Sequence, residues 1–175
     1  MIRPYRPSDR AALLEITVRA FDGVSIDQNV EREYGVIAGI GWQERKASHV
    51  EADIAVNPRG ILVFELHGQP VGFVTCRSDP HTLIGSIPNL AVDPDHQGKG
   101  IGKRLVQAAL DSLRSLGMRY ARIETLEQNC RCVALYPAMG FREIARQIHY
   151  ILPLEEHAPD PEPAHGKPLP APPGR

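Results

Sequence analysis

One short stretch, DPDHQGKGIGKRL over residues 93–105, restricts the fold of this chain more than any other. It places glycines at positions 98, 100 and 102, and apolar residues at helical spacing follow at once. Glycine adopts positive φ and lets a ligand approach bare backbone, while a helix N-terminus offers unpaired N–H groups and a partial positive charge. The stretch therefore predicts a strand-to-helix turn that can hold a phosphate. A tight connection without a ligand is the alternative.

Two familiar nucleotide-binding patterns do not fit this turn. A Walker A loop requires a glycine five residues before its Gly-Lys pair and a serine or threonine after it, but Gln97 and Arg104 occupy those places. A dinucleotide fingerprint requires glycines at relative positions 1, 3 and 6, and the sixth position counted from Gly98 or Gly100 is not glycine. No serine or aspartate set at a strand end suggests a bound magnesium ion. These failures weaken the hypothesis of a nucleotide-phosphate-binding domain.

The composition predicts one globular domain with a short tail. The 175 residues are 42% hydrophobic, which suits a single core, and we assign it to residues 1–154. Residues 155–175 are rich in proline with almost no large apolar side chain, so we expect them to be disordered, although a ligand for a proline-recognition module is an alternative. Basic residues (20) nearly balance acidic ones (21), which gives no general attraction to nucleic acid or to an anionic membrane.

The three cysteines, Cys76, Cys130 and Cys132, are expected to be reduced thiols, because an odd number does not suggest a disulfide-stapled secreted scaffold. The Cys130-Arg131-Cys132 spacing does not match common zinc pairs, so no metal site is expected. No apolar run approaches the roughly 20 residues of a membrane span, and no signal peptide is apparent. We therefore expect a cytoplasmic protein.

The hydrophobic pattern predicts strands and helices in a mixed order. Residues 27–54 favour helix interrupted at Gly35, Gly39 and Gly41. The other helices are expected from Ser8 or Asp9 to Ala20, over 101–116 before Gly117, and over 129–136. Strands are expected over 2–6, 61–66, 71–76, 86–92, 120–126 and 141–152, with a turn at 67–70. This order predicts a mixed α/β sheet with helices on both faces.

Two motifs give the chain a resemblance to a known family. Gln97, Gly100 and Gly102 satisfy the pattern (Gln/Arg)-x-x-Gly-x-(Gly/Ala), and the downstream run Asn129-x-x-Cys132-x-x-Leu135-Tyr136-x-x-x-Gly140-Phe141 follows in order. Both motifs resemble those of the GNAT superfamily of N-acyltransferases, in which the first binds acyl-CoA. The resemblance covers residues 61–150, is only topological before them and finds no match in 155–175. Cys132 replaces a customary alanine, and Pro137 is expected to shorten the last turn of its helix.

The resemblance implies a fold and a donor. It implies a central sheet of six to seven strands that splays between the fourth and fifth, where the pantetheine arm of acetyl-CoA pairs with backbone. On this chain the backbone groups would come from Leu90, Ala91 and Val92. The pyrophosphate would lie on the turn, and the implied cofactor-binding residues there and beyond are Gln97, Gly98, Lys99, Gly100, Ile101, Gly102, Lys103, Asn129 and Tyr136. Acetyl-CoA would be the acyl donor, with no metal.

The resemblance also implies catalytic residues. Tyr136 stands at the position of the general acid that protonates the leaving thiolate, and packing of the helix against the sheet is its alternative role. Glu124 corresponds to a catalytic glutamate of several members and would be the base, unless it is an exposed strand residue or pairs with Arg122. The need for a base depends on the acceptor, since an α-amino group is about one-tenth neutral at pH 7 and a lysine amine about one part in 2,500.

The predicted function is acetyl transfer from acetyl-CoA to a primary amine of a small molecule, peptide or protein. A catalytically silent acyl-CoA-binding or sensing domain is the alternative, and the retained Tyr136 favours the enzyme. The acidic residues of 27–53 suggest a cationic acceptor, but a solvated helix face explains the same charges and is the favoured interpretation. We expect no nucleic-acid or membrane partner, and a homodimer is common among similar families.

Overall fold

The computed structural model describes residues 1–154. Met1–Ala145 forms one compact unit, and the described residues 146–154 belong to a second unit. The predicted disorder of residues 155–175 lies outside the described residues. The predicted domain boundary at residue 154 therefore stays a prediction.

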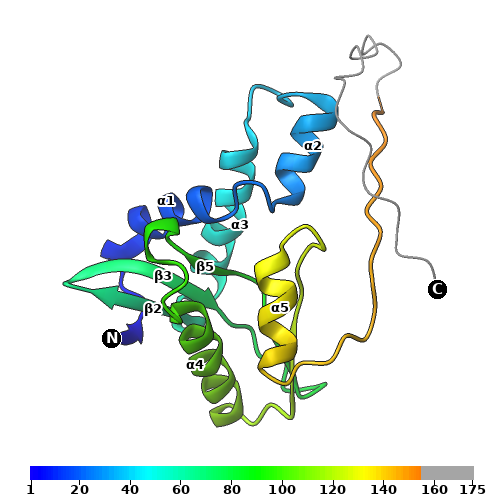
Figure 1. The fold of residues 1–175 in the computed structure, drawn as a ribbon. Helices are drawn as coiled ribbons and strands as arrows, with labels where there is room; N and C mark the ends of the chain where they lie inside the picture. Colours follow the sequence, from blue (N-terminus) through cyan, green and yellow to red (C-terminus); the bar gives the residue numbers. More distant parts are fainter. Residues whose placement is uncertain (155–175) are drawn as a thin grey trace. The chain divides into compact units, whose positions relative to one another are not determined.

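The strands of the first unit form two hydrogen-bonded sheets (Figure 1). Four antiparallel strands lie in the order β1-β2-β3-β5, and β4 pairs in parallel with β6. An isolated bridge between Arg77 and Ser86 connects the end of β3 with β4. The strands are β1 (Ile2–Pro4), β2 (Ile61–Leu66), β3 (Gln69–Thr75), β4 (Ile84–Ile87), β5 (Leu90–Val92) and β6 (Tyr120–Ile123).

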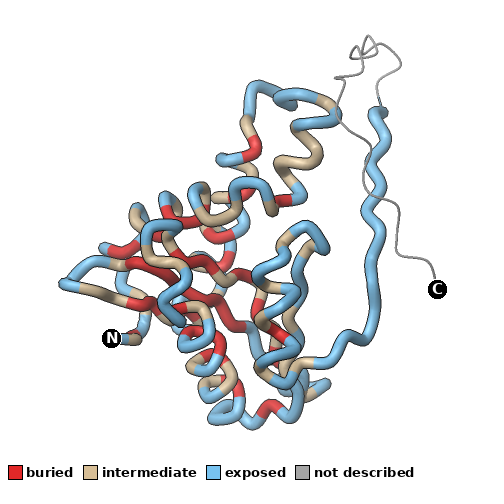
Figure 2. Tube along the Cα trace, in the orientation of Figure 1, coloured by how far each residue is buried: buried red, intermediate tan, exposed pale blue. Residues whose placement is uncertain are grey.

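Helices cover both faces of the four-stranded sheet. Consecutive residues of its strands enter different cores: Val63, Phe73 and Ala91 lie in one with α1 and α3, whereas Phe64, Val74 and Val92 lie in the other with α4 and α5. Figure 2 shows the buried positions gathered in these strands and in the helices beside them. The helices are α1 (Arg10–Ala20), α2 (Ile26–Tyr34), α3 (Trp42–Val56), α4 (Ile101–Ser115) and α5 (Cys130–Ala138), with short turns η1 (Pro7–Asp9), η2 (Pro58–Gly60) and η3 (Pro94–His96). The mixed α/β class with helices on both faces is confirmed.

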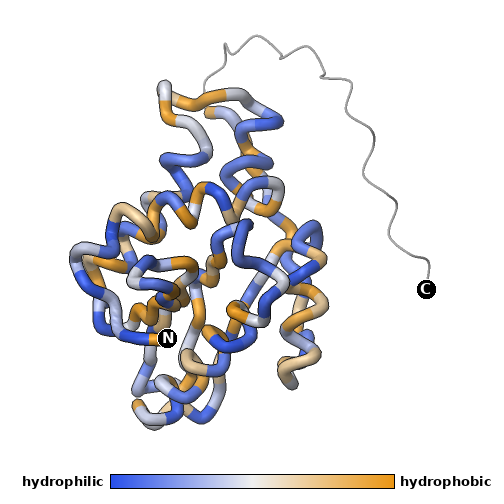
Figure 3. Tube along the Cα trace, turned by 60° about the vertical axis from the view of Figure 1, so that its left-hand side comes forward, coloured by the Kyte–Doolittle hydropathy of each residue, from blue (hydrophilic) through white to orange (hydrophobic). Residues whose placement is uncertain are grey.

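The predicted interruption of helix within 27–54 is also confirmed. Helix α2 ends at Gly35, and α3 begins after Gly41. Gly35 and Gly39 have φ of 72° and 76°, values that favour glycine and stop a helix. The loop between α2 and α3 carries the exposed apolar residues Val36, Ile37 and Ile40. Figure 3 shows hydrophobic positions in this part of the chain.

Three predicted strands are shorter than expected: the one over 2–6 ends at Pro4, and those over 86–92 and 120–126 are cut at neighbouring positions. The run over 86–92 is divided into β4 and β5 at Pro88, which has no N–H to donate to a ladder. Ser86 exchanges both backbone hydrogen bonds with Arg77, so by alternation Pro88 lies where the next donor toward β3 would be, and the pairing with β3 resumes one residue out of register at Asn89. The parallel pairing of β4 with β6 has its last pair at Ile87 and Ile123. The strand predicted over 120–126 therefore stops at Ile123 and leaves Glu124 outside it.

The strand predicted over 141–152 is wrong, because the described residues 141–154 form no strand. An alternating pattern produces a strand only where a neighbouring strand supplies the ladder hydrogen bonds. Ile144, Ile148 and Tyr150 are accordingly exposed. Six strands thus exist in the described part of the chain.

The hairpin turn between β2 and β3 is tighter than the predicted 67–70. His67 and Gly68 connect the strands with positive φ at both positions, the conformation of a two-residue hairpin turn.

A buried ion pair fixes the start of the chain. The Arg3 guanidinium donates to both carboxylate oxygens of Asp9, at 2.7 and 2.9 Å, and the Arg6 N–H donates to Asp9 Oδ2 at 2.8 Å. Arg3 also donates to Glu65 of β2. These hydrogen bonds, that from Arg3 foremost, lower the pKa of Asp9. The pair joins β1 to the first turn before α1.

We expect Asp9→Asn to lower the free energy of unfolding by about 3 kcal/mol at pH 7, because it leaves the buried Arg3 without its counter-charge. A lowered folded-state pKa stabilises the protein above the unfolded-state pKa of about 4, and this contribution is lost as the pH falls below it. Urea unfolding at pH 7 and pH 3 measures the difference. An equal difference at both pH values would contradict this account. Glu51→Gln, which breaks the exposed pair with Arg10, should change stability by less than about 1 kcal/mol.

Candidate active site

The first turn of α4 presents a row of unpaired backbone donors. Gly98 and Gly100 have φ of 75° and 76°, which bends the chain sharply before the helix begins at Ile101. The helix has no side-chain cap, and we find no acceptor in the described residues for the backbone N–H groups of residues 98–103. A Cβ built at Gly98 or Gly100 would meet nothing within 4 Å, so both positions are open. The turn therefore fits an anion, as the sequence predicts.

Side chains brace this turn from two directions. Gln97 Nε2 donates to the carbonyl of Val92 at 2.9 Å, which ties the turn to β5. Arg19 at the end of α1 pairs with both Asp93 and Asp95, ahead of the glycines. Gln97 was predicted, but Arg19 was missed, because nothing in the sequence indicates a contact across more than seventy residues.

The basic side chains near the turn are not equivalent. Lys99 Nζ donates to the carbonyl of Asp95 at 3.0 Å. Lys103 is exposed, and Arg104 lies over the Phe64 ring, 4.7 Å from its centroid. Of these three side chains, that of Lys103 is the one with no hydrogen bond or cation–π contact to another described residue.

In strand β5, the backbone hydrogen-bonding groups of two of the three residues face away from β3. The Thr75 N–H donates to the carbonyl of Asn89, and the Asp93 N–H donates to the carbonyl of Val71. Backbone groups alternate along an antiparallel strand, so Ala91 also faces β3, and Leu90 and Val92 face the opposite side. This narrows the prediction for residues 90–92, because the backbone groups of Ala91 belong to the sheet. Leu90 has both groups available, and Val92 has its N–H.

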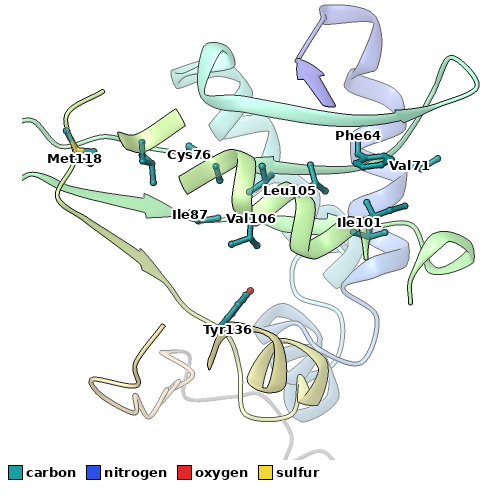
Figure 4. Packing of buried hydrophobic residues seen from close by; sticks show 13 residues of the cluster. Phe64, Val71, Cys76, Ile87, Ile101, Leu105, Val106, Met118 and Tyr136 are labelled. Carbon is teal, nitrogen blue, oxygen red and sulfur yellow. The ribbon is translucent and has the colours of Figure 1, made fainter. Parts of the chain in front are cut away.

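Tyr136 belongs to helix α5 and lies in the buried core that α5 shares with α4. Helix α5 begins at Asn129, whose side chain accepts from the Cys132 N–H at 3.3 Å and so caps the helix. Tyr136 projects from α5 toward α4 (Figure 4), is 9% exposed, and packs on Phe141 with ring centroids 5.9 Å apart. Burial, with Cys132 adding to it, raises the pKa of the Tyr136 hydroxyl well above its usual range, so the hydroxyl stays protonated.

One position shows that the three elements converge. A Cβ built at Gly102 of α4 would lie 3.9 Å from both the Val92 side chain of β5 and the Leu135 side chain of α5. Tyr136 and Ile101 belong to the same buried cluster. The structure thus brings together the glycine turn predicted to hold an anion, strand β5 with its outward groups, and the predicted acid.

Glu124 is not part of the buried cluster that contains Tyr136. It lies one residue past β6, is exposed, and makes no hydrogen bond or ion pair among the described residues. The pairing with Arg122 considered as an alternative does not form there. Glu124 is therefore an exposed carboxylate just beyond the end of β6.

The acidic residues of 27–53 are largely neutralised by ion pairs. Asp27 and Glu31 lie near Arg45, Glu51 pairs with Arg10, and Asp53 pairs with Arg77. These contacts remove most of the argument for a cationic acceptor. Two open hollows of about 210 and 390 Å³ lie beside Trp42 on this side, and the larger also touches Arg19 and Pro94.

Two further observations concern metals and membranes. Within residues 1–154, no cluster of histidine, cysteine and acidic side chains has the make-up of a metal site, and the three cysteines are free thiols. No helix in the same range combines the length and apolarity needed to cross a bilayer.

Fold and site together define an α/β protein with an uncapped, glycine-rich helix N-terminus beside an open strand edge. Residues 25–141 match the Acetyltransferase (GNAT) family, which is more than half of the chain. The chain belongs to this family.

Individual relatives agree with this assignment. Mycothiol acetyltransferase of Segniliparus rotundus is 30% identical over 86% of this chain and 54% of its own length, and N-alpha-acetyltransferase 30 of Saccharomyces cerevisiae is 36% identical over 47% and 49%. The chain thus spans about half the length of these curated relatives. The PaiA N-acetyltransferase of Thermoplasma acidophilum, solved in complex with coenzyme A, has a TM-score of 0.65 at 18% identity over 81% of this chain and 89% of that chain.

The turn glycines should respond differently to alanine. Gly100→Ala should lower the free energy of unfolding by about 1 kcal/mol, because its positive φ strains any residue with a Cβ. Gly102→Ala should raise it by a few tenths of a kcal/mol, because the residue is helical and its Cβ finds ordinary contacts. Urea unfolding of both variants tests this pair, and equal changes would show that backbone strain is not the reason for glycine at 100.

Proposed function

We propose that this protein is an N-acetyltransferase that transfers an acetyl group from acetyl-CoA to a primary amine in a ternary complex. The observation that carries the proposal is the uncapped first turn of α4, with the unpaired N–H groups of residues 98–103 beside the outward groups of β5. Membership of the Acetyltransferase (GNAT) family and the acetyltransferase names of the relatives support it.

The donor fits the chain at two places. The N–H groups of 98–103 would receive the pyrophosphate, with Lys103 available to neutralise charge. The amides of the pantetheine arm would pair with Leu90 and Val92, on the side of β5 that faces away from β3. Acetyl-CoA supplies the thioester whose carbonyl carbon accepts the amine. That a similar fold was solved with coenzyme A is consistent with this placement.

Tyr136 acts at the leaving group. The amine nitrogen attacks the thioester carbon, the C–N bond forms, the C–S bond breaks, and the thiolate receives a proton from the Tyr136 hydroxyl. The raised pKa of Tyr136 keeps that proton in place at neutral pH. Its packing on Phe141 fixes the ring, so the packing role and the acid role are compatible.

The amine must lose a proton during the reaction. An α-amino acceptor is sufficiently neutral to react through water, whereas a lysine amine needs a base. Glu124 is free and exposed at the end of β6, so it can take this proton from an acceptor bound at the rim. The relatives named for N-alpha acetylation and for mycothiol indicate that the family accommodates different acceptors, and we propose only the class of primary amine here.

A binding domain without catalysis is the second candidate function. The exposed position of Glu124 favours it, because no held base accompanies the donor site. The two functions differ in one measurement, thiol release from acetyl-CoA in the presence of amines.

We expect Gly100→Asp to abolish acetyl-CoA binding, because it places a carboxylate and backbone strain against the pyrophosphate position. Isothermal calorimetry with acetyl-CoA measures the binding. Gly117→Asp is the matched control, since Gly117 has the same positive φ and the same open surroundings at the other end of α4, and it should bind normally. Absence of binding heat in the wild type would refute the proposed function.

We expect Tyr136→Phe to lower kcat about 100-fold while the Kd for acetyl-CoA changes by less than about twofold, because only the hydroxyl is removed. Thiol release across small-molecule, α-amino and lysine-type amines gives kcat and also identifies the acceptor class. Tyr120→Phe, at an exposed tyrosine of β6, is the control and should be silent. An unchanged kcat would show that Tyr136 is not the general acid and that its role is to pack α5 in the core.

A further inference from the structure

A buried polar cluster lies at the break between β4 and β5, and the proposed reaction does not use it. It consists of Lys46 and Asp53 of α3, Thr75 of β3, and Asn89, with Arg77 at its edge; we call it the Asn89 cluster. The first four residues are each at most 9% exposed. Buried polar groups carry a desolvation cost that an apolar core would avoid, so their presence here needs a reason.

Asn89 is held through every polar atom that it has. Its backbone N–H donates to Thr75 Oγ1 at 3.1 Å, and its carbonyl accepts from the Thr75 N–H at 2.9 Å. Its side chain accepts from Lys46 Nζ at 2.9 Å and donates to Asp53 Oδ2 at 2.8 Å. A residue fixed at four points allows little rotation of the chain on either side of it.

The charges of the cluster are balanced within it. The Asp53 carboxylate also accepts from Thr75 Oγ1 at 2.7 Å and from the partly exposed Arg77 guanidinium. The Lys46 ammonium lies 3.9 Å from the centroid of the Phe21 ring, a cation–π contact. Burial lowers the pKa of Lys46, and the nearby Asp27 and Asp53 oppose this shift.

The cluster adjoins the donor strand directly. Asn89 is followed by Leu90, the first residue of β5, whose N–H and C=O point away from β3. Pro88, on the other side, cannot contribute a ladder donor, so the main chain at the break depends on Asn89 for its direction. A small rotation at Asn89 would turn the outward groups of Leu90 most directly. The turn at residues 98–103 lies farther along the chain, beyond Asp93 and Asp95, which Arg19 of α1 holds in place.

We propose that the Asn89 cluster positions the β5 backbone for the pantetheine arm of the donor, so that Asn89, Lys46 and Asp53 are positioning residues for one half of acetyl-CoA. This inference rests on the proposed function. It separates donor binding into two parts: the cluster governs the pantetheine half, and the glycine turn governs the phosphate half.

Lys46 is a positioning residue rather than the base of the reaction. Its Nζ is occupied by Asn89 and the Phe21 ring, and within the described residues neither hollow beside Trp42 is lined by Lys46. The nitrogen that a base would need is therefore already engaged within the cluster.

The test compares two ligands by calorimetry: acetyl-CoA, and 3′-phosphoadenosine 5′-diphosphate, which keeps the phosphates and lacks the pantetheine arm. Asn89→Ala should raise the Kd for acetyl-CoA about tenfold, and the Kd for the diphosphate should stay within about twofold. Lys46→Met, which keeps the side-chain stem over Phe21, gives the same pattern in milder form should Asn89→Ala not fold. Gly100→Asp should lose both ligands.

Arg3→Met is the matched control, since it breaks a buried ion pair of the same sheet far along the chain from β5. It should lower the melting temperature and leave both Kd values unchanged. If the cluster variants behave as Arg3→Met does, or weaken both ligands equally, the inference is wrong although the proposed function stands. If kcat falls with an altered pH profile while both Kd values stay constant, Lys46 acts in the chemistry and the inference is also wrong. If wild-type protein binds no acetyl-CoA, the proposed function fails, and this inference with it.

Discussion

The missing N–H of Pro88 determines how the two sheets are joined. Ser86 exchanges both backbone hydrogen bonds with Arg77, so Pro88 lies where the next donor toward β3 would be, and the pairing with β3 resumes one residue out of register at Asn89 and Thr75. The chain then turns at Asn89 and pairs with β3 as β5. An antiparallel strand exposes the backbone groups of every second residue when its far side has no neighbour, so this single imino acid leaves Leu90 and Val92 with free hydrogen-bonding groups. The open edge is thus a consequence of ordinary sheet geometry, without strain.

Helix α4 follows β5 after only a short turn, so its N-terminus lies close to the end of that strand. The positive φ of Gly98 and Gly100 lets the helix begin directly after the turn, with its first N–H groups uncapped by any side chain. Gly102 then packs between Val92 and Leu135 without crowding. Two sets of backbone donors, one from a strand and one from a helix, therefore meet beside α5. Side-chain identity is of little importance for such a site, whereas backbone conformation and position are decisive.

This explains what the sequence could and could not predict. Glycines at 98 and 100 and the periodic apolar residues after them report backbone conformation directly, so the turn, α4 and the family resemblance could be predicted. Arg19, Asp53 and Lys46 contact residues far along the chain, and such contacts leave no local pattern. The strand predicted over 141–152 does not form, for the same reason. An alternating pattern shows that a segment is able to pair in a sheet, but it does not supply the neighbouring strand with which to pair. Glu124 was assigned to a strand interior, but β6 ends at Ile123, opposite Ile87, and Glu124 lies beyond the strand.

The burial of Tyr136 also restricts how it can serve the proposed reaction. An alkyl thiol has a pKa near about 8.5, and a tyrosine whose pKa is raised above its usual value of about 10 is the weaker acid. Complete transfer of its proton to a free thiolate is then uphill, whereas a hydrogen bond to the sulfur as the C–S bond breaks stabilises the developing charge without that cost. The proton moves once the leaving thiolate is held in the same poorly solvated place, because burial raises the pKa of a thiol as it raises that of a phenol. The environment that makes Tyr136 a poor acid in isolation therefore also makes the thiolate a better base, and the two pKa values approach each other only while the donor is bound.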